Sequence, residues 1–190
     1  MDEKIKSYFN RHIELFRLVE QQMVEDINQA ATILIEALRS GRKILVMGNG
    51  GSAADAQHFS AELVGRYLKD RGAIAAIALS TDTSILTAVG NDFGFDEIFS
   101  RQVEALAGKE DVLFCISTSG NSQNIINAVK TGKKIGCRTF GLLGKDGGKL
   151  AMDVDHALII QNSETPLVQD VHGAIIHILC GLIEDSMRGK

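Results

Sequence analysis

Apolar residues in the first forty positions recur at steps of three and four, which predicts amphipathic helix. The stretch is long for a single helix in a chain of 190 residues. We therefore expect residues 1–40 to form two helical segments or an extended arm of the kind that covers a partner subunit. The apolar positions are Ile5, Phe9, Ile13, Phe16, Val19, Met23, Ile27, Ala31, Leu34 and Leu38.

After Gly41 the pattern changes to short apolar runs separated by helical segments. Apolar strands that alternate with helices predict a parallel sheet covered on both faces. The expected fold class is therefore α/β, a three-layer doubly wound sandwich with five parallel strands. The strand candidates are Lys43–Gly48, Ala73–Leu79, Asp111–Ser117, Arg138–Gly144 and His156–Gln161, and the clearest helices span 123–135 and 167–187.

Composition and charge narrow the class of protein. The chain is 45% hydrophobic and 23% charged, which is typical of a soluble globular protein. With no linker and a single proline, we expect one domain over 1–190, formed by the helical segment 1–40 and an α/β core at 41–190. A net charge of −4 argues against nucleic acid or an anionic membrane as partner. The first residues carry charges and no apolar signal core, so we expect a cytoplasmic protein.

Two loops follow the same design of strand, small-residue loop and helix, in ILVMGNGGSAADAQHF and LFCISTSGNSQNIINAV. Such loops bring backbone N–H groups and a helix N-terminus to an anion. Neither is a dinucleotide fingerprint or a Walker loop, so a phosphosugar is the better ligand class. The alternative is that glycine and serine serve turns and helix caps, with Ser52 and Ser122 as caps. Four hydroxyls would add phosphate donors, those of Ser117, Thr118, Ser119 and Ser122.

Candidate acid, base and metal-binding side chains lie on two helices. His58 and Glu62 stand four residues apart, which puts them on one helix face about 5–6 Å apart at Cβ. Gln169, His172 and His177 interrupt an otherwise apolar C-terminal helix. Each alone could be an ordinary surface or core residue, but together they could transfer protons or bind a divalent cation. Gln169 and His177 are about 12 Å apart along an ideal helix, so both reach one ion only if they lean together or if Gln169 precedes the helix.

Four motifs in the same order resemble the SIS-domain phosphoheptose isomerases along residues 2–186. They are GNGGSAADAQHFSAEL, VGNDFGF, ISTSGNS and QDVHGAIIH. The resemblance implies an SIS fold and the conversion of sedoheptulose 7-phosphate to D-glycero-D-manno-heptose 7-phosphate, an early step toward the heptose of lipopolysaccharide or another surface glycan. It also implies a homotetramer with active sites at subunit interfaces and one zinc per subunit.

The resemblance also assigns roles to residues. Glu62 would be the general base and His177 the general acid. Many relatives have arginine, isoleucine and glutamate where this chain has Leu167, Val168 and Asp170, so any contact made through that arginine is absent here. The implied zinc ligands are His58, Glu62, Gln169 and His177. The implied substrate contacts are Asn49, Gly50, Gly51, Ser52, Glu62, Arg66, Asn91, Asp92, Ser117, Thr118, Ser119, Ser122 and Gln169.

Two other functions compete with this interpretation. A related SIS protein is a non-catalytic tetrameric scaffold that binds the replication initiator, and it has a similar serine loop. That scaffold lacks the carboxylate at the position of Glu62 and the imidazole at the position of His177, and both are present here. The third possibility is an isomerase of another phosphosugar, such as arabinose 5-phosphate or an aminosugar phosphate.

Overall fold

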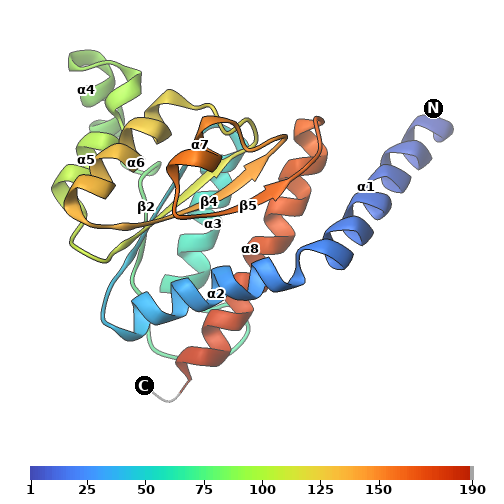
Figure 1. Cartoon of the computed structure of the whole chain (residues 1–190), viewed down its shortest axis with the longest axis horizontal. Helices are drawn as coiled ribbons and strands as arrows, with labels where there is room; N and C mark the ends of the chain where they lie inside the picture. The colour runs from blue at the N-terminus through green and yellow to red at the C-terminus, as the bar shows by residue number, and fades with distance from the viewer. Residues whose placement is uncertain (189–190) are drawn as a thin grey trace.

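In the computed structural model, which describes residues 1–188, a five-stranded parallel sheet runs through the centre of the molecule (Figure 1). The strand order is β2-β1-β3-β4-β5, so the predicted fold class is confirmed. β2 is shorter than predicted because it is an edge strand that pairs only from Ala76 to Ala78. The strands are β1 Ile44–Gly48, β2 Ala76–Ala78, β3 Val112–Ser117, β4 Arg138–Gly144 and β5 His156–Ile160.

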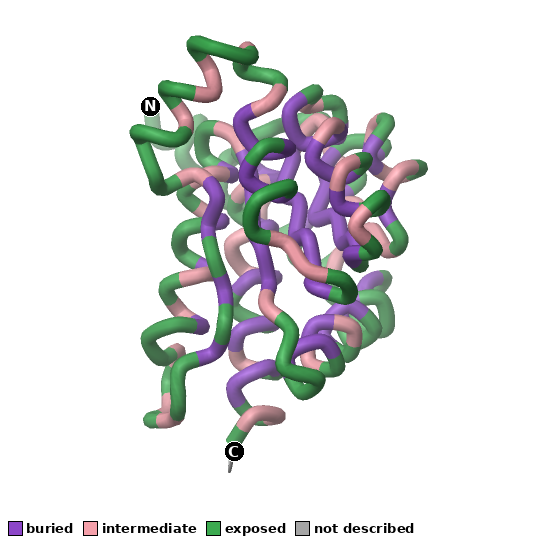
Figure 2. The backbone as a smooth tube through the Cα atoms, turned by 90° about the vertical axis from the view of Figure 1, so that its left-hand side faces the viewer, coloured by how far each residue is buried: buried purple, intermediate pink, exposed green. Residues whose placement is uncertain are grey.

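Helices cover both faces of the sheet and bury two apolar cores. α2, α3 and α8 contribute to the core on one face, and α5, α6 and α7 to the core on the other. Figure 2 shows the buried segments inside and the exposed ones around them. The helices are α1 Asp2–Gln22, α2 Val24–Arg39, α3 Gly51–Val64, α4 Thr83–Asp92, α5 Ser100–Leu106, α6 Gln123–Ile135, α7 Gly148–Asp153 and α8 Thr165–Met187, with a 3-10 turn at Phe95–Glu97.

The strand order reverses between β1 and β3, since β2 lies on one side of this pair and β4 and β5 on the other. Ligands of doubly wound sheets bind at such a point, beyond the carboxyl ends of the strands. Both small-residue loops predicted from the sequence follow these two strands. Gly120 in the second loop has a φ of +63°, and a Cβ there would lie 1.9 Å from the carbonyl oxygen of Gly147. Only glycine fits this turn.

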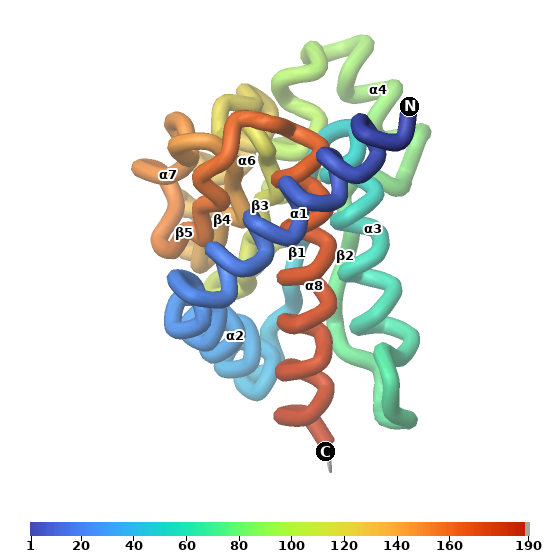
Figure 3. The backbone as a smooth tube through the Cα atoms, turned by 90° about the vertical axis from the view of Figure 1, so that its right-hand side faces the viewer, coloured from blue at the N-terminus to red at the C-terminus, as the bar shows by residue number. Residues whose placement is uncertain are grey.

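The N-terminal region forms two helices, as predicted, with a break at Met23 between α1 and α2. α2 buries six residues in the core, whereas α1 buries only Leu15. Figure 1 shows α1 projecting beyond the sheet, and Figure 3 shows it crossing α8. Its exposed side includes Ile5, Phe9 and Ile13. A helix with so much unburied apolar surface is suited to cover another protein surface.

α8 is, within residues 1–188, the one helix long and apolar enough to cross a membrane by length and composition. Half of that apolar window is buried inside the protein, where Val171, Ile175 and Leu179 pack in the core beneath the sheet. The apolar character of α8 is therefore explained by packing.

The three cysteines, Cys115, Cys137 and Cys180, are free and buried. Burial raises the pKa of the Cys115 and Cys180 thiols to about 12 and that of Cys137 to about 11. Thiols with such pKa values are poor nucleophiles at neutral pH, so these cysteines act as small apolar core residues.

Candidate active site

Three predicted site residues meet between α3 and α8, which run side by side on one face of the sheet (Figure 3). Nε2 of His58 lies 3.1 Å from Oε1 of Glu62 and 3.4 Å from Nε2 of His177. The two imidazole rings are 4.9 Å apart and nearly perpendicular. The structure thus brings Glu62 and His177 together through His58, although α3 and α8 are separated by 100 residues of chain.

Helical periodicity explains why these side chains face each other. On α3, Ala56, Phe59 and Leu63 are buried, which leaves His58 and Glu62 on a partly exposed face. On α8 the neighbours Ile176 and Leu179 are buried and His177 is exposed. Burying the apolar stripe of each helix against the sheet therefore turns the polar stripes toward the same groove.

An open cavity of about 530 Å³ continues this groove toward the start of both helices. Gln169 and His177 both line it, although they are eight residues apart. Gln169 lies inside α8, so the idea that it precedes the regular helix is wrong. Its amide packs on Gly51, where an added Cβ would be 1.7 Å from Nε2. The lining residues are Gly51, Ala54, Asp55, Gln169, Asp170, Gly173, Ala174 and His177.

Asp55 is a cavity residue that the sequence reasoning missed. Its pKa is raised to about 6, mainly by burial; nearby His58 lowers the pKa and Asp170 raises it. Its Oδ2 atom is buried without a hydrogen-bond partner in the described chain. The signal was available in the sequence, because Asp55 precedes His58 by three residues and Glu62 by seven, which is one helix face.

His172, the other possible metal ligand on α8, points away from this groove. It is fully buried, and its Nε2 lies 3.2 Å from the carbonyl oxygen of Leu143 in β4. Burial lowers the pKa of His172 to about 4. Between the two candidates left open by the sequence, the geometry favours Gln169.

In the serine loop after β3, serine hydroxyls accept hydrogen bonds from backbone N–H groups of the same loop. The backbone N–H of Gly120 donates to Oγ of Ser117, which lies 3.3 Å from Oγ of Ser122. The N–H of Asn121 donates to Oγ of Ser119. Ser122 occupies the N-cap position of α6, but its side chain makes no capping hydrogen bond, and Ser52 lies inside α3, which has none either. The alternative role of these two serines as side-chain caps is therefore not seen.

The glycine loop after β1 is joined by a pair of side-chain amides to the helix that follows the serine loop. Asn49 and Asn124 exchange two hydrogen bonds of 2.9 Å, one in each direction. Asn124 lies in the first turn of α6, next to Ser122. This pair holds the loop of Asn49, Gly50 and Gly51 against the serine loop at the switch point of the sheet.

Of the predicted substrate contacts, Gly51 and Gln169 line this cavity and the others do not. Asn91 and Asp92 are exposed at the end of α4, and Arg66 is exposed in the loop after α3. None of them lines the cavity beside His177. α4 buries none of its ten residues, and Figure 1 shows it at the margin of the molecule. Within one chain, the structure does not bring α4 to the His58–Glu62–His177 cluster.

The chemistry of the cluster suits a divalent cation. An ionised carboxylate only accepts hydrogen bonds, so His58 Nε2 must donate to Glu62, which leaves no lone pair on that nitrogen for His177. Two ligands bound tetrahedrally at zinc distances are themselves about 3.3–3.4 Å apart, and the observed separations are 3.4 and 3.1 Å. As they stand, however, no three His, Cys, Asp or Glu side chains of residues 1–188 are grouped to hold a metal ion.

The fold and the site define a class of protein. The pattern of the SIS domain matches residues 7–144, so the chain belongs to the SIS-domain proteins. Within them it belongs to the phosphoheptose isomerase family. The phosphoheptose isomerase of Syntrophotalea carbinolica is 51% identical over 96% of this chain and 93% of its own length.

Solved structures agree with this membership. The phosphoheptose isomerase of Neisseria gonorrhoeae has a TM-score of 0.92 and 44% identity, with 97% of this chain and 98% of that chain covered. The enzyme of Francisella tularensis has a TM-score of 0.94 and 36% identity, with 96% and 97% covered. The chain is therefore an isomerase that acts on a phosphosugar, and the function predicted from the sequence is confirmed over the non-catalytic scaffold.

Proposed function

We propose that this isomerase interconverts sedoheptulose 7-phosphate and D-glycero-D-manno-heptose 7-phosphate in the groove between α3 and α8. Relatives that align with this chain over nearly their whole length are named phosphoheptose isomerase. The observation that carries the mechanism is the meeting of Glu62, His58 and His177 beside the open cavity. A carboxylate and an imidazole are the two groups that an aldose–ketose isomerisation requires.

In the ketose-to-aldose direction, the Glu62 carboxylate removes a proton from C1, next to the C2 carbonyl. His177 gives an N–H proton of its imidazole to the carbonyl oxygen, so the product of this half is a neutral enediol. Glu62 then returns its proton to C2, and His177 takes the hydroxyl proton from the oxygen on C1. Both residues end the cycle in their starting protonation states, which balances the reaction.

The two loops at the switch point hold the phosphate and the far end of the sugar. Ser117, Thr118, Ser119 and Ser122 supply hydroxyls, and the α6 N-terminus supplies backbone N–H groups and a favourable dipole. Asn49, Gly50, Gly51 and Ser52 line the adjoining side. The supporting observation is the Asn49–Asn124 pair, which keeps both loops in contact with each other.

His58, Glu62, Gln169 and His177 would hold one zinc ion per subunit. When bound, the metal would act as a Lewis acid on the carbonyl and hydroxyl oxygens of the sugar. The support comes from two separations, His58 Nε2 to Glu62 Oε1 at 3.1 Å and His58 Nε2 to His177 Nε2 at 3.4 Å, which are close to the spacing of ligands around one tetrahedral ion. Gln169, as a cavity-lining amide, is the fourth candidate.

Asn91, Asp92 and Arg66 would reach the sugar in an assembly of several subunits, which we take to be a homotetramer. α4 buries none of its residues and carries two of these contacts, and α1 exposes Ile5, Phe9 and Ile13. Exposed apolar helices of this kind favour burial against a second copy of the chain. The enzyme would work in the cytoplasm, at an early step toward the heptose of lipopolysaccharide or another surface glycan.

The direct test is incubation with sedoheptulose 7-phosphate, followed by NMR of the sugar protons. An aldoheptose phosphate should accumulate to a fixed ratio, and in D₂O the product should carry deuterium at C2. Arabinose 5-phosphate under the same conditions is the comparison substrate and should turn over far more slowly. If only arabinose 5-phosphate reacts, the chain is an isomerase of another phosphosugar.

A further inference from the structure

One stripe of α8 carries His177, Gly181 and Glu184, spaced by four and three residues so that they share a helix face. The loop that follows α3 packs along this stripe. The ring of Tyr67 lies 5.9 Å from the imidazole of His177, with their planes inclined by 23°. It also lies over Gly181, where an added Cβ would meet the ring at 3.5 Å. Tyr67 therefore flanks the proposed acid on the side of α8 away from the cavity entrance at Gly51.

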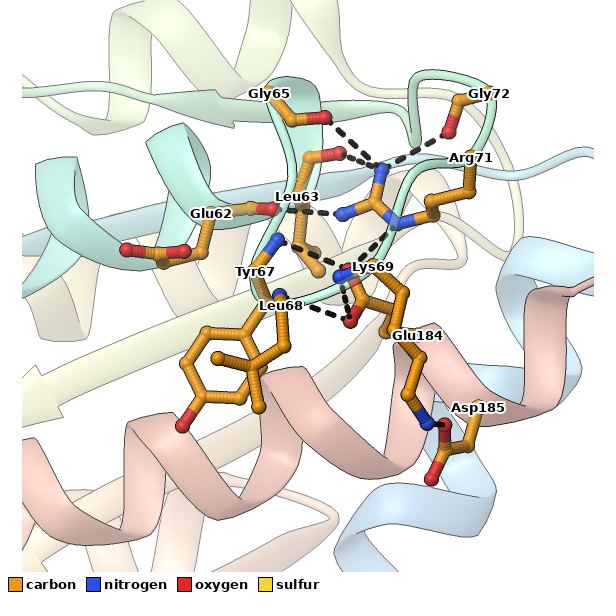
Figure 4. A network of polar contacts seen from close by, with 10 residues as sticks. All are labelled: Glu62, Leu63, Gly65, Tyr67, Leu68, Lys69, Arg71, Gly72, Glu184 and Asp185. Carbon is orange, nitrogen blue, oxygen red and sulfur yellow. Dashed lines mark hydrogen bonds and ion pairs between the residues drawn. The ribbon is translucent and has the colours of Figure 1, made fainter.

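Glu184 fixes the backbone of this loop (Figure 4). Its buried carboxylate accepts hydrogen bonds from three consecutive backbone N–H groups, those of Tyr67, Leu68 and Lys69, at 2.9–3.0 Å. Burial alone would raise the pKa of Glu184, but the three N–H donors and the nearby guanidinium of Arg71 outweigh it and lower the pKa. A buried, fully hydrogen-bonded carboxylate is a rigid anchor.

Arg71 connects the same anchor to the end of α3. Its Nε lies 3.4 Å from Oε1 of Glu184, and its side chain is only 3% exposed. Nη2 donates to the carbonyl oxygen of Glu62 at 2.7 Å, and Nη1 donates to that of Leu63 at 2.7 Å. Nη1 also reaches the carbonyls of Gly65 and Gly72. Figure 4 shows the backbone carbonyl of Glu62 turned toward Arg71 and its carboxylate turned away.

We propose that the Arg71–Glu184 pair and Tyr67 are positioning residues for the isomerisation. The pair holds the backbone of Glu62 from one side, and the loop that it anchors holds Tyr67 against His177 from the other. The proposed base and the proposed acid are thus both positioned by the buried carboxylate of Glu184, which lies seven residues after His177 on α8. This inference rests on the proposed roles of Glu62 and His177 and extends them to the groups that set their relative position.

The physical reason is the sensitivity of proton transfer to distance. A misplacement of about 1 Å at the reacting groups can cost a rate factor of about 100. Removing a positioning group should therefore lower kcat while the phosphate loops, which lie at the N-terminal ends of α3 and α6, keep KM nearly unchanged. If the loop served stability alone, a substitution in it would lower the melting temperature. It would not change kcat at a temperature where the protein is folded.

The test compares Tyr67→Ala, Tyr67→Phe and Leu68→Ala. Leu68 is the matched control, because it lies in the same loop with its side chain 70% exposed. We expect Tyr67→Ala to lower kcat about tenfold or more with KM within about twofold, and Tyr67→Phe and Leu68→Ala to keep kcat within about twofold. Arg71→Lys, which keeps the charge but loses the fork of donors, should lower kcat in the same way.

A crystal structure of Tyr67→Ala supplies a readout that does not depend on turnover. In it, the His177 imidazole should leave its contact with His58, whereas the Leu68→Ala structure should retain that contact. A Tyr67→Ala enzyme with unchanged kcat, or with an unmoved His177 ring, overturns the inference. If Glu62→Gln keeps full activity while His177 still moves in Tyr67→Ala, the proposed catalytic roles fail and the positioning of His177 stands.

Discussion

His177 on α8 places its Nε2 atom 3.4 Å from Nε2 of His58 on α3, and that same His58 nitrogen lies 3.1 Å from the Glu62 carboxylate. This contact joins two helices that are distant in the chain and defines the centre of the candidate site. A single imidazole nitrogen cannot satisfy both neighbours as an ordinary donor–acceptor pair. The cluster is therefore suited to transfer a proton or to bind a cation. Each of its three residues can be tested by a separate substitution.

Glu62→Gln should lower kcat by about 10²–10⁴, which is the usual contribution of a general acid or base. The amide keeps the size of the side chain and its contact with His58 but cannot accept a proton from carbon. The measurement is steady-state turnover of sedoheptulose 7-phosphate, with circular dichroism and sedimentation to check fold and assembly.

Glu104→Gln is the matched control, since Glu104 is exposed on α5 and pairs with Arg101 at the surface. Its kcat should equal that of the wild type. Wild-type turnover in Glu62→Gln would remove this carboxylate from the mechanism.

Ser119→Ala combined with Ser122→Ala should raise KM and leave kcat nearly unchanged. Hydrogen bonds to a charged group contribute about 1.5–3 kcal/mol each, so the loss of two should raise KM by about 10²-fold or more. Ser40→Ala is the control, because Ser40 lies between α2 and β1 at the opposite end of the sheet. Substrate titration of initial rates measures the effect. An unchanged KM in the double variant would mean that the phosphate binds away from the serine loop.

Local pattern was sufficient to predict most of the fold. The strand at Arg138–Gly144 and the helix at Gln123–Ile135 begin and end where the sequence predicted. The helix ends at Gly136, which has the left-handed φ of +92° that favours glycine. β2 was predicted too long because an apolar run forms a strand only where it pairs with a neighbour. As an edge strand, β2 pairs with β1 over Ala76–Ala78. Register between strands is a tertiary property that a single segment does not contain.

The site was predictable only where one helix carried it. His58 and Glu62 share a helix face by spacing, and Asp55 on the same face could have been found in that way. The contact of His58 with His177, and the inward direction of His172, depend on how α8 is rotated against the sheet. Asn91 and Asp92 lie on α4, which packs on the second core through the partly buried Leu86 and Val89, and the spacing of residues along the chain did not predict where this helix lies.

His172 should make the protein less stable as the pH falls. Burial lowers its folded-state pKa to about 4, below the ordinary 6.5, so the unfolded chain binds a proton more readily between these values. The stability is full above pH 6.5 and is lost as the pH falls toward 4. From pH 7 to pH 5 this group alone should cost about 2 kcal/mol of unfolding free energy.

The measurement is urea unfolding at both pH values for the wild type and for His172→Leu, which keeps the buried position apolar. The variant should lose about 2 kcal/mol less than the wild type over this interval, whatever its absolute stability. Equal losses in the two proteins would mean that His172 becomes protonated in the fold at its ordinary pKa.

Removal of metal should lower activity, and zinc should restore it. Imidazole and carboxylate ligands bind zinc in their deprotonated forms, and Nε2 of His58 lies 3.1 Å from Oε1 of Glu62 and 3.4 Å from Nε2 of His177. Dialysis against a chelator followed by stepwise zinc addition should recover turnover at one equivalent per chain. Metal content measured by mass spectrometry should fall in His58→Ala and stay at one in His156→Ala, since His156 stacks on Phe140 at the start of β5 and takes no part in the groove. Full turnover of the metal-free enzyme would reduce zinc to an incidental occupant, and the Glu62–His177 proton transfer would then have to stand without it.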